Sequence, residues 1–283
     1  MGFLNGLLLL VFSLKAVHSC QVALPPLVTA SGCKTCATYY ALGAREDGCG
    51  YKLKLPKSDA GEEEEFTACC DMTRGGFTLI QKRMDGSLSF AQDWADYKAG
   101  FGNASAGKEF WLGLERMHRL TTQCGLTSAR IDLAFCDGAT AYEDYALVNE
   151  KKENEQVEGE GTKYRLSISG ASGPAWDGLQ VLDKGYTPNG RAFSTRDQDN
   201  DGISADCAQT YGGGGGWWYG VCGWSWPNAG YKCGSDGQAS SSPFLENGHP
   251  IGFVWRHPHP SKNLRLRVRV LKGSAIKLRP PTA

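Results

Sequence analysis

The sequence lacks an excess of charge of one sign, a collagen or heptad repeat, and the common catalytic motifs. Its 283 residues carry 30 Lys and Arg against 30 Asp and Glu, so the formal net charge is zero and no overall field attracts nucleic acid or anionic lipid. No collagen repeat and no heptad run is present. An HExxH pattern and a nucleophile elbow are also missing, and we expect no enzyme.

Only the N-terminus is strongly apolar. Residues 1–19 hold an apolar run from Leu7 to Phe12, which is too short to span a bilayer, and end in small residues around Ser19. This pattern predicts a cleaved secretory signal peptide. No second long apolar segment follows, so we expect a secreted, extracellular protein without membrane insertion.

Cysteine is abundant for a chain of this length. In a secreted protein, cysteines form a disulfide framework more often than a metal site. The pair Cys33 and Cys36 has the spacing of half a zinc ribbon, but no second such pair follows at the right distance. The odd count leaves at least one thiol unpaired within the chain. The 11 cysteines are Cys20, Cys33, Cys36, Cys49, Cys69, Cys70, Cys124, Cys136, Cys207, Cys222 and Cys233.

An acidic loop is the clearest candidate for a ligand site. Asp197, Asp199 and Asp201 alternate along the chain and are closed by Gly202. Calcium accepts six to eight oxygen ligands from one flexible loop, so this pattern predicts Ca²⁺ as the cofactor. An EF-hand is a rival interpretation, but its twelfth position, which needs a glutamate, would be Ala208, and this disfavours it. A solvated acidic turn without metal is the remaining alternative.

Secondary structure is predicted for several segments. Residues 66–83 form two strands joined by a glycine turn, residues 94–102 form a short helix ended by glycine, and a further helix starts within residues 109–120. Residues 264–270 alternate apolar and basic side chains, which is typical of a half-buried strand rather than a heparin patch. His249, His257 and His259 are each followed by proline, and we interpret them as surface histidines.

These segments resemble the fibrinogen C-terminal globular domain, which is found in fibrinogen chains, ficolins, tachylectins and angiopoietins. The resemblance extends from about Cys36 to Leu271, and the order and spacing of its motifs make it specific. The motifs are Cys70-Asp71-Met72, Gly75-Gly76-Phe77-Thr78, Gln81 to Ser87, Asp93-Trp94 to Tyr97, Gly100-Phe101-Gly102, Glu109 to Gly113, Phe193 to Asp201, Cys207-Ala208, Trp217-Trp218 and Gly252 to Trp255.

The resemblance implies an α+β fold with three parts. These are a small N-terminal subdomain, a central and mainly antiparallel sheet with short helices, and a loop-rich, calcium-binding C-terminal subdomain. The expected organisation is a signal peptide at 1–19, a short N-terminal segment at 20–35, the fibrinogen-like domain at 36–273 and a C-terminal tail at 274–283.

Disulfide pairs also follow from the resemblance. It implies Cys36 with Cys70 and Cys207 with Cys222, and it places Cys49 in a strand beside Cys69. Cys124 and Cys136, which flank the strand at residues 130–135, are expected to pair with each other. Cys20, Cys33 and Cys233 are left unassigned, so a disulfide-linked homo-oligomer is one possible consequence.

The resemblance carries two groups of site residues onto this sequence. The calcium ligands would be the side chains of Asp199 and Asp201 and the backbone carbonyls of Ile203 and Ala205. An acetyl-binding pocket of the lectin members would be lined by Tyr211, Trp218, Gly223 and Trp224. Departures from the lectin pattern include Gly223 in place of histidine, and His249 and Ser261 in place of pocket aromatics, although Trp226, Tyr231 and Phe244 could rebuild a pocket.

Two functions are compatible with these residues. The first is a secreted, calcium-dependent lectin of innate immunity that binds acetylated glycans. The alternative is a protein ligand or matrix component of angiopoietin or fibrinogen type, which binds a protein receptor through the same surface. Gly223 favours the alternative, and Tyr211 favours the lectin. The sequon at Asn103 predicts an N-linked glycan in either case.

Overall fold

The computed structural model describes residues 32–57, 63–148, 159–180, 185–233, 252–256 and 268–281. Several predictions concern residues outside these ranges. They are the signal peptide at 1–19, Cys20, Phe244, His249, His257, His259 and Ser261, together with the first part of the predicted strand at 264–270.

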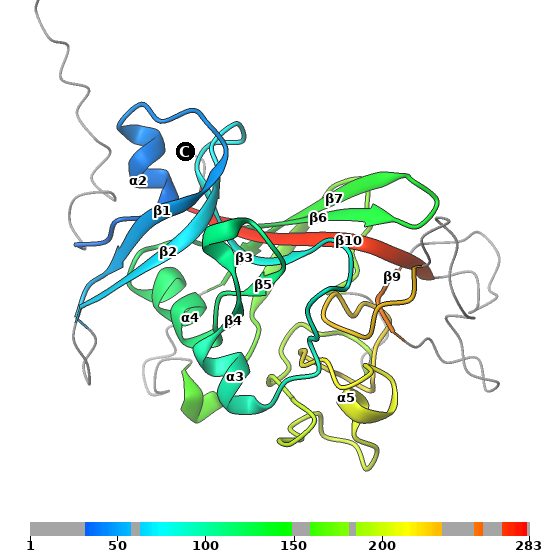
Figure 1. Cartoon of the computed structure of the whole chain (residues 1–283). Coiled ribbons are helices and arrows are strands. Elements are labelled where there is room, and N and C mark those ends of the chain that lie inside the picture. The colour runs from blue at the N-terminus through cyan, green and yellow to red at the C-terminus, as the bar shows by residue number, and fades with distance from the viewer. Residues whose placement is uncertain are drawn as a thin grey trace, which may run out of the picture.

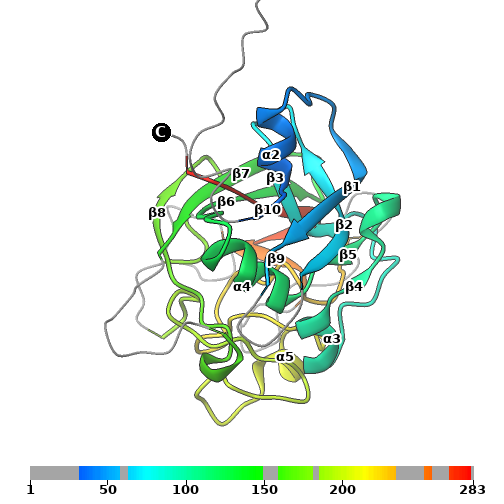
Figure 2. The same ribbon diagram turned by 90° about the vertical axis from the view of Figure 1, so that its left-hand side faces the viewer.

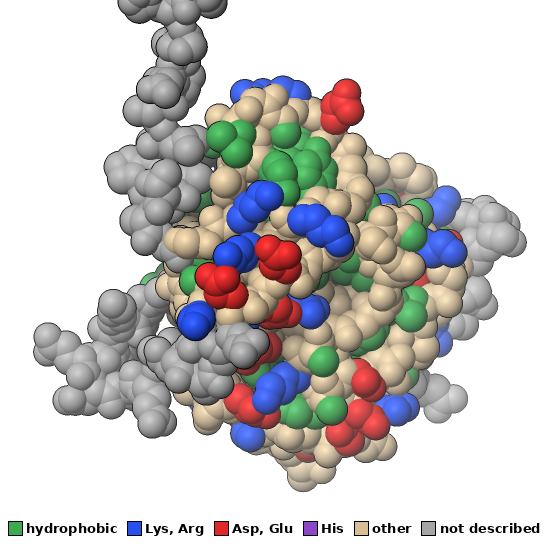
Figure 3. Space-filling model, turned by 60° about the vertical axis from the view of Figure 1, so that its left-hand side comes forward, with side chains coloured by type: hydrophobic (Ala, Val, Ile, Leu, Met, Phe, Trp, Pro, Cys, Tyr) green, Lys and Arg blue, Asp and Glu red, His purple; other side chains and the backbone are tan. Residues whose placement is uncertain are grey.

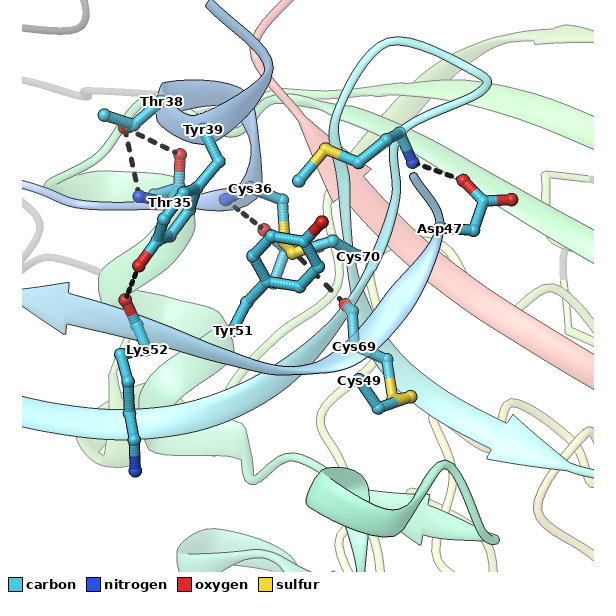
Figure 4. Close-up of a disulfide and its surroundings, with 12 residues drawn as sticks. Thr35, Cys36, Thr38, Tyr39, Asp47, Cys49, Tyr51, Lys52, Cys69 and Cys70 are labelled. Atoms are coloured by element: carbon cyan, nitrogen blue, oxygen red, sulfur yellow. Dashed lines mark hydrogen bonds between the residues drawn. A yellow bond between two sulfur atoms is a disulfide. The ribbon is translucent and has the colours of Figure 1, made fainter. Parts of the chain in front are cut away.

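A small N-terminal subdomain begins the described fold. It contains helix α2 (Cys36–Ala41) and the antiparallel strands β1 (Gly48–Leu55) and β2 (Glu64–Asp71), which lie together at one end of the molecule (Figure 1). Cys49 pairs directly with Cys69 in the strand register, as the sequence led us to expect. Figure 4 shows the Cys36–Cys70 disulfide and the hydrogen bond from the Tyr39 hydroxyl to the Lys52 carbonyl, which tie α2 to this hairpin.

The central sheet follows the order β1-β2-β3-β10-β6-β7-β8, and each pairing between consecutive strands in this order is antiparallel. Strand β10 (Val268–Arg279) lies between β3 and β6, and it crosses the whole molecule in Figure 1. The other strands are β3 (Phe77–Arg83), β4 (Phe101–Gly102), β5 (Phe110–Trp111), β6 (Ser128–Phe135), β7 (Thr140–Leu147), β8 (Ile168–Ser172) and β9 (Val254–Arg256).

The predicted C-terminal tail at 274–283 is wrong for most of its length, because β10 continues to Arg279. Ile276 and Leu278 point into the core and are almost fully buried. Lys277 between them is also buried, and its ammonium group is bonded to Asp71 and Asp132. A buried lysine is tolerated only when it is paired in this way.

Short helices cover one side of the sheet and the loops below it. They are α3 (Trp94–Ala99), α4 (Leu114–Thr122), α5 (Cys207–Thr210) and the 3₁₀ turns η1 (Ala104–Ala106) and η2 (Glu160–Thr162). Figure 2 shows α4 directly beneath the β6, β7 and β10 strands.

The helix predicted within residues 109–120 begins later than its first residues. Phe110 and Trp111 form β5, which pairs with Lys82 and Gln81, so the helix starts only at Leu114. The buried carboxylate of Glu109 accepts backbone N–H groups from residues 84, 85, 86 and 88, which holds the loop after β3 against β5.

Five disulfides link the described residues. Cys36–Cys70, Cys49–Cys69 and Cys207–Cys222 are the pairs that we expected. The expected pair Cys124–Cys136 is wrong: Cys33 bonds Cys124, and Cys136 bonds Cys233. Strand β6 separates Cys124 from Cys136, and an extended strand of eight residues spans about 25 Å. A disulfide needs its two Cα atoms within about 7 Å, so these two residues cannot meet.

Candidate calcium and ligand site

The acidic loop starts at a tight turn that is tied to helix α3. Thr195 and Gln198 exchange two backbone hydrogen bonds, of 3.0 and 3.1 Å. The side chain of Asp197 accepts the backbone N–H of Trp94, the first residue of α3, and the hydroxyl of Thr195. Asp197 therefore anchors the loop to the helix.

Asp199 and Asp201 lie next to each other further along this loop. Asp199 is exposed and accepts the backbone N–H of Asp201 at 3.0 Å. Asp201 is buried, with 3% of its surface exposed, and accepts the N–H groups of Ile203 and Cys207 at 3.0 and 2.9 Å. Burial raises the pKa of Asp201, and the charge of Asp199 raises it further, against the lowering effect of these two backbone bonds.

This donor set fits a hard cation. Two adjacent carboxylates that repel each other, with the carbonyls of Ile203 and Ala205 close by in sequence, offer oxygen ligands of the kind that Ca²⁺ prefers. Within the ranges that the structure describes, no group of three or more His, Cys, Asp or Glu side chains is placed to hold a metal. A cation at this loop would therefore also depend on backbone carbonyls and water.

The acidic loop leads directly into a disulfide-bonded corner. Helix α5 starts at Cys207, and its N-cap Asp206 accepts the N–H of Gln209. The Cys207–Cys222 bond joins this helix to a turn in which Cys222 and Gly223 have φ values of +51° and +67°. A Cβ at Gly223 would lie 3.0 Å from the carbonyl oxygen of Tyr186 in a backbone conformation that side chains rarely adopt.

Aromatic side chains surround this corner. Tyr211 is half-buried, and its ring centroid lies 6.3 Å from that of Trp226. Trp224 is also half-buried, and its ring lies 6.0 Å from Tyr186. Gly223 lies between the two pairs: a Cβ there would lie 3.0 Å from the carbonyl oxygen of Tyr186 and 3.4 Å from the indole nitrogen of Trp226. We call Tyr186, Tyr211, Trp224 and Trp226 the aromatic strip.

Trp218 does not join the aromatic strip, so its predicted place in the ligand pocket is wrong. Its ring packs 5.0 Å from Phe193, and its indole N–H donates to the carbonyl of Tyr164 at 2.7 Å. The next residue, Tyr219, lies instead against Trp226. Trp218 is 5% exposed, and its ring also packs 5.0 Å from that of Trp217, so it belongs to the core.

The Gly223 backbone is also already engaged. Its N–H donates to the carbonyl of Val221 at 2.7 Å and is therefore not directed at a ligand. Tyr231, which we considered for a rebuilt pocket, donates to the Lys272 carbonyl on the sheet side of the molecule. Of the predicted pocket residues, Tyr211, Gly223 and Trp224 lie around the same disulfide corner.

A buried polar network that sequence reasoning missed fixes this corner to the sheet. Gln81 of β3 donates to the side chain of Asn228, and Asn228 donates to the carbonyl of Gly216. Asn228 is fully buried. The glycine run before Trp217 is close-packed, since a Cβ at Gly215 would collide with the carbonyl of Asn228. The signal in the sequence is Asn228, a polar residue in the aromatic-rich segment 217–231, because a polar side chain buried among such residues needs hydrogen-bond partners.

This geometry defines a disulfide-bonded α+β domain with an acidic loop and an aromatic strip at its loop-rich end. The family model described as the C-terminal globular domain of fibrinogen beta and gamma chains matches residues 32–280. The chain belongs to this fibrinogen C-terminal domain family. The match begins before Cys36 and ends at Pro280, so it includes the residues of β10 that we had expected to form a tail.

Known relatives agree in sequence and in fold. The chain is 35% identical over 236 residues to the human fibrinogen gamma chain, with 78% of this chain and 48% of the relative covered. It is 40% identical over 192 residues to angiopoietin-4 of Bos taurus, covering 67% of this chain and 34% of the relative. The chain thus spans about half, or less, of the length of these relatives.

Solved structures place the fold in the same family. The fibrinogen-like globe domain of human ANGPTL2 has a TM-score of 0.65 at 26% identity, with 88% of this chain and 99% of that chain covered. Lamprey fibrin D-dimer, complexed with the peptide ligand Gly-His-Arg-Pro-amide, has a TM-score of 0.69 at 30% identity, with 87% of this chain and 73% of that chain covered.

Proposed function

We propose that this domain is a secreted recognition module that binds a protein partner through the aromatic strip, with the acidic loop held in place by calcium. Binding rather than catalysis is proposed because the relatives are fibrinogen chains, an angiopoietin and fibroleukin. One similar structure holds a peptide ligand, which supports a peptide segment as the element that is recognised.

The observation that carries this proposal is the shape of the disulfide corner. An acetyl pocket needs several rings and a donor that converge on one small group. Here Trp218 lies in the core, the Gly223 N–H is bonded to Val221, and Gly223 supplies no side chain. The remaining half-buried rings, Tyr211 and Trp224, suit a broader contact with the side chains of a peptide.

Secretion is supported by the five disulfides, which persist in oxidising compartments. None of the helices in the described part of the chain is long and apolar enough to cross a membrane. The face shown in Figure 3 mixes acidic and basic side chains, which favours a local contact over a charged polymer.

A calcium-dependent lectin for acetylated glycans is the second candidate. The half-buried ring of Tyr211, at the end of the helix that follows the acidic loop, favours it, because an aromatic face can stack on a sugar. In that case the partner would be an acetylated glycan of innate immune recognition rather than a protein.

Parallel peptide and glycan arrays, probed with the labelled full domain in calcium and in chelator, separate the two candidates. We expect saturable, calcium-dependent binding to peptides and none to acetylated sugars. Tyr211→Ala should weaken peptide binding by about 1 to 3 kcal/mol, because one aromatic contact is lost. Binding of acetylated sugars without any peptide binding would replace this proposal with the lectin.

A further inference from the structure

An apolar cavity lies beneath the sheet, away from the aromatic strip. Its volume is about 110 Å³, and it is bounded by three parts of the fold. Ile131 and Ile276 line it from β6 and β10, Leu114 lines it from α4, and Trp217 and Trp218 line it from the C-terminal loops. Figures 1 and 2 show α4 beneath these strands.

The cavity has a buried floor and a more exposed rim. Ile131, Leu114 and Trp217 on the floor are each at most 2% exposed. Half-buried side chains of Met117, Leu147, Val148 and Leu166 also line it, between the helix α4 and the end of β7. The cavity is therefore least enclosed at this rim.

One polar atom of a lining residue is unusual. The indole nitrogen of Trp217 is buried and has no hydrogen-bond partner, whereas that of Trp218 donates to Tyr164. The two tyrosine hydroxyls of the lining are engaged, because Tyr145 bonds Asp177 and Tyr164 bonds Glu115. Buried polar groups are nearly always paired, and an apolar cavity tends to stay dry. An acceptor brought by a ligand would satisfy the Trp217 N–H.

We propose that this cavity binds a small, uncharged, apolar molecule that carries one hydrogen-bond acceptor, such as a cyclic ketone. A cavity of about 150 Å³ lined by apolar side chains holds benzene, so a ligand for this smaller cavity has about four or five heavy atoms. A charged ligand does not suit the floor, where Ile131, Leu114 and Trp217 carry no charge; the charged side chain of the lining, Arg165, is exposed. The acceptor bonds Trp217, and the ring packs between Ile131 and Leu114.

Two matched probes test the cavity and the donor separately. Cyclobutanone carries the acceptor, and methylenecyclobutane has nearly the same shape without it. Saturation-transfer NMR on the full domain should show saturable binding of both, with the ketone preferred. Trp217→Phe should lower the ketone affinity about tenfold, as expected for one buried hydrogen bond, and change the hydrocarbon affinity less than about twofold.

A second variant keeps the test independent of Trp217. Ala129 of β6 is 7% exposed and lines the cavity, so Ala129→Leu should fill the space and abolish binding of both probes. Circular dichroism and thermal unfolding check that each variant is folded. Absence of saturable binding to the natural sequence, or binding that survives Ala129→Leu, would overturn the site. An unchanged preference for the ketone in Trp217→Phe would overturn the role of the indole.

Discussion

The two aspartates of the acidic loop allow the proposed calcium site to be tested against its own structural role. Asp201→Ala removes a buried acceptor of two backbone hydrogen bonds, from Ile203 and Cys207. An unsatisfied buried donor costs about 1 to 3 kcal/mol, and the loss of repulsion from Asp199 offsets part of this. In chelator we therefore expect Asp201→Ala to lower the free energy of unfolding by about 2 kcal/mol.

Asp199→Ala is the matched control. Its carboxylate is exposed and accepts one local bond, so its removal in chelator should cost less than about 1 kcal/mol. Calcium at a hundredfold excess over its dissociation constant stabilises a folded protein by about 2.7 kcal/mol. Because both side chains would be ligands, both variants should lose most of this increment.

Urea unfolding, monitored by tryptophan fluorescence in chelator and in calcium, measures for each variant the stability cost without metal and the increment that calcium adds. The two effects are separable because the structural cost appears in chelator and the metal effect appears only on adding calcium. If Asp199→Ala keeps the full calcium increment, the loop is not the calcium site. Equal costs of the two variants in chelator would show that the hydrogen bonds of Asp201 do not stabilise the fold.

Four further predictions each rest on one feature of the sequence or the structure. Replacing Cys33 and Cys124 by serine should lower the free energy of unfolding in urea by about 2 to 5 kcal/mol, because the bond closes a separation of 91 residues. Since the other ten cysteines are paired, a free thiol or an intermolecular disulfide should involve Cys20 alone. A reactive thiol at Cys33 would contradict this. Burial, with help from Asp177 and Asp144, raises the pKa of Glu143 to about 7. The folded state therefore holds the proton more tightly than the unfolded state. The free energy of unfolding should fall by about 2 kcal/mol between pH 5 and 7, relative to Glu143→Gln, and change little above pH 7. Parallel pH profiles of the two proteins would refute this. Asn103 is exposed at the start of η1, and we expect it to carry an N-linked glycan, so glycosidase treatment should reduce the mass of the secreted protein. A secreted protein of bare peptide mass would contradict this.

Local features of the fold were predictable because the responsible residues are close in sequence. The turn between β2 and β3 needs Gly75 and Gly76, whose φ values are +99° and +77°. A Cβ at Gly76 would lie 2.6 Å from the Cβ of Tyr40, so the glycine is also required by packing against α2. The glycine pair between two apolar segments predicts this turn from the sequence alone.

Long-range features were not predictable in the same way. Lys277 resembles a surface residue until Asp71 and Asp132, which are 206 and 145 residues away, are placed beside it. The pairing of Cys33 with Cys124 likewise joins residues that are 91 positions apart, and no local pattern predicts it. The error at Cys124 and Cys136 was avoidable, however, because the predicted strand between them already keeps them apart.

The side on which each ring of the candidate site lies was the least predictable property. Trp217, Trp218 and Tyr219 are all almost fully buried, and the sequence alone does not reveal which aromatic rings each of them contacts. The backbone decides, because Trp217 bonds Ser194 through its N–H and carbonyl and so fixes the phase of the segment. Tyr219 then lies against Trp226, and Trp218 lies against Phe193.

The acidic loop and the aromatic strip are joined by a short, continuous path. Asp201 accepts the N–H of Cys207, Cys207 is bonded to Cys222, and Cys222 precedes Gly223 at the centre of the strip. A cation that fixes the Asp201 carboxylate would therefore also restrain the first turn of α5, and α5 ends beside Tyr211. Restraining Tyr211 before a partner binds lowers the entropy cost of binding. Calcium would thus strengthen recognition through the order it imposes on the strip, without touching the ligand.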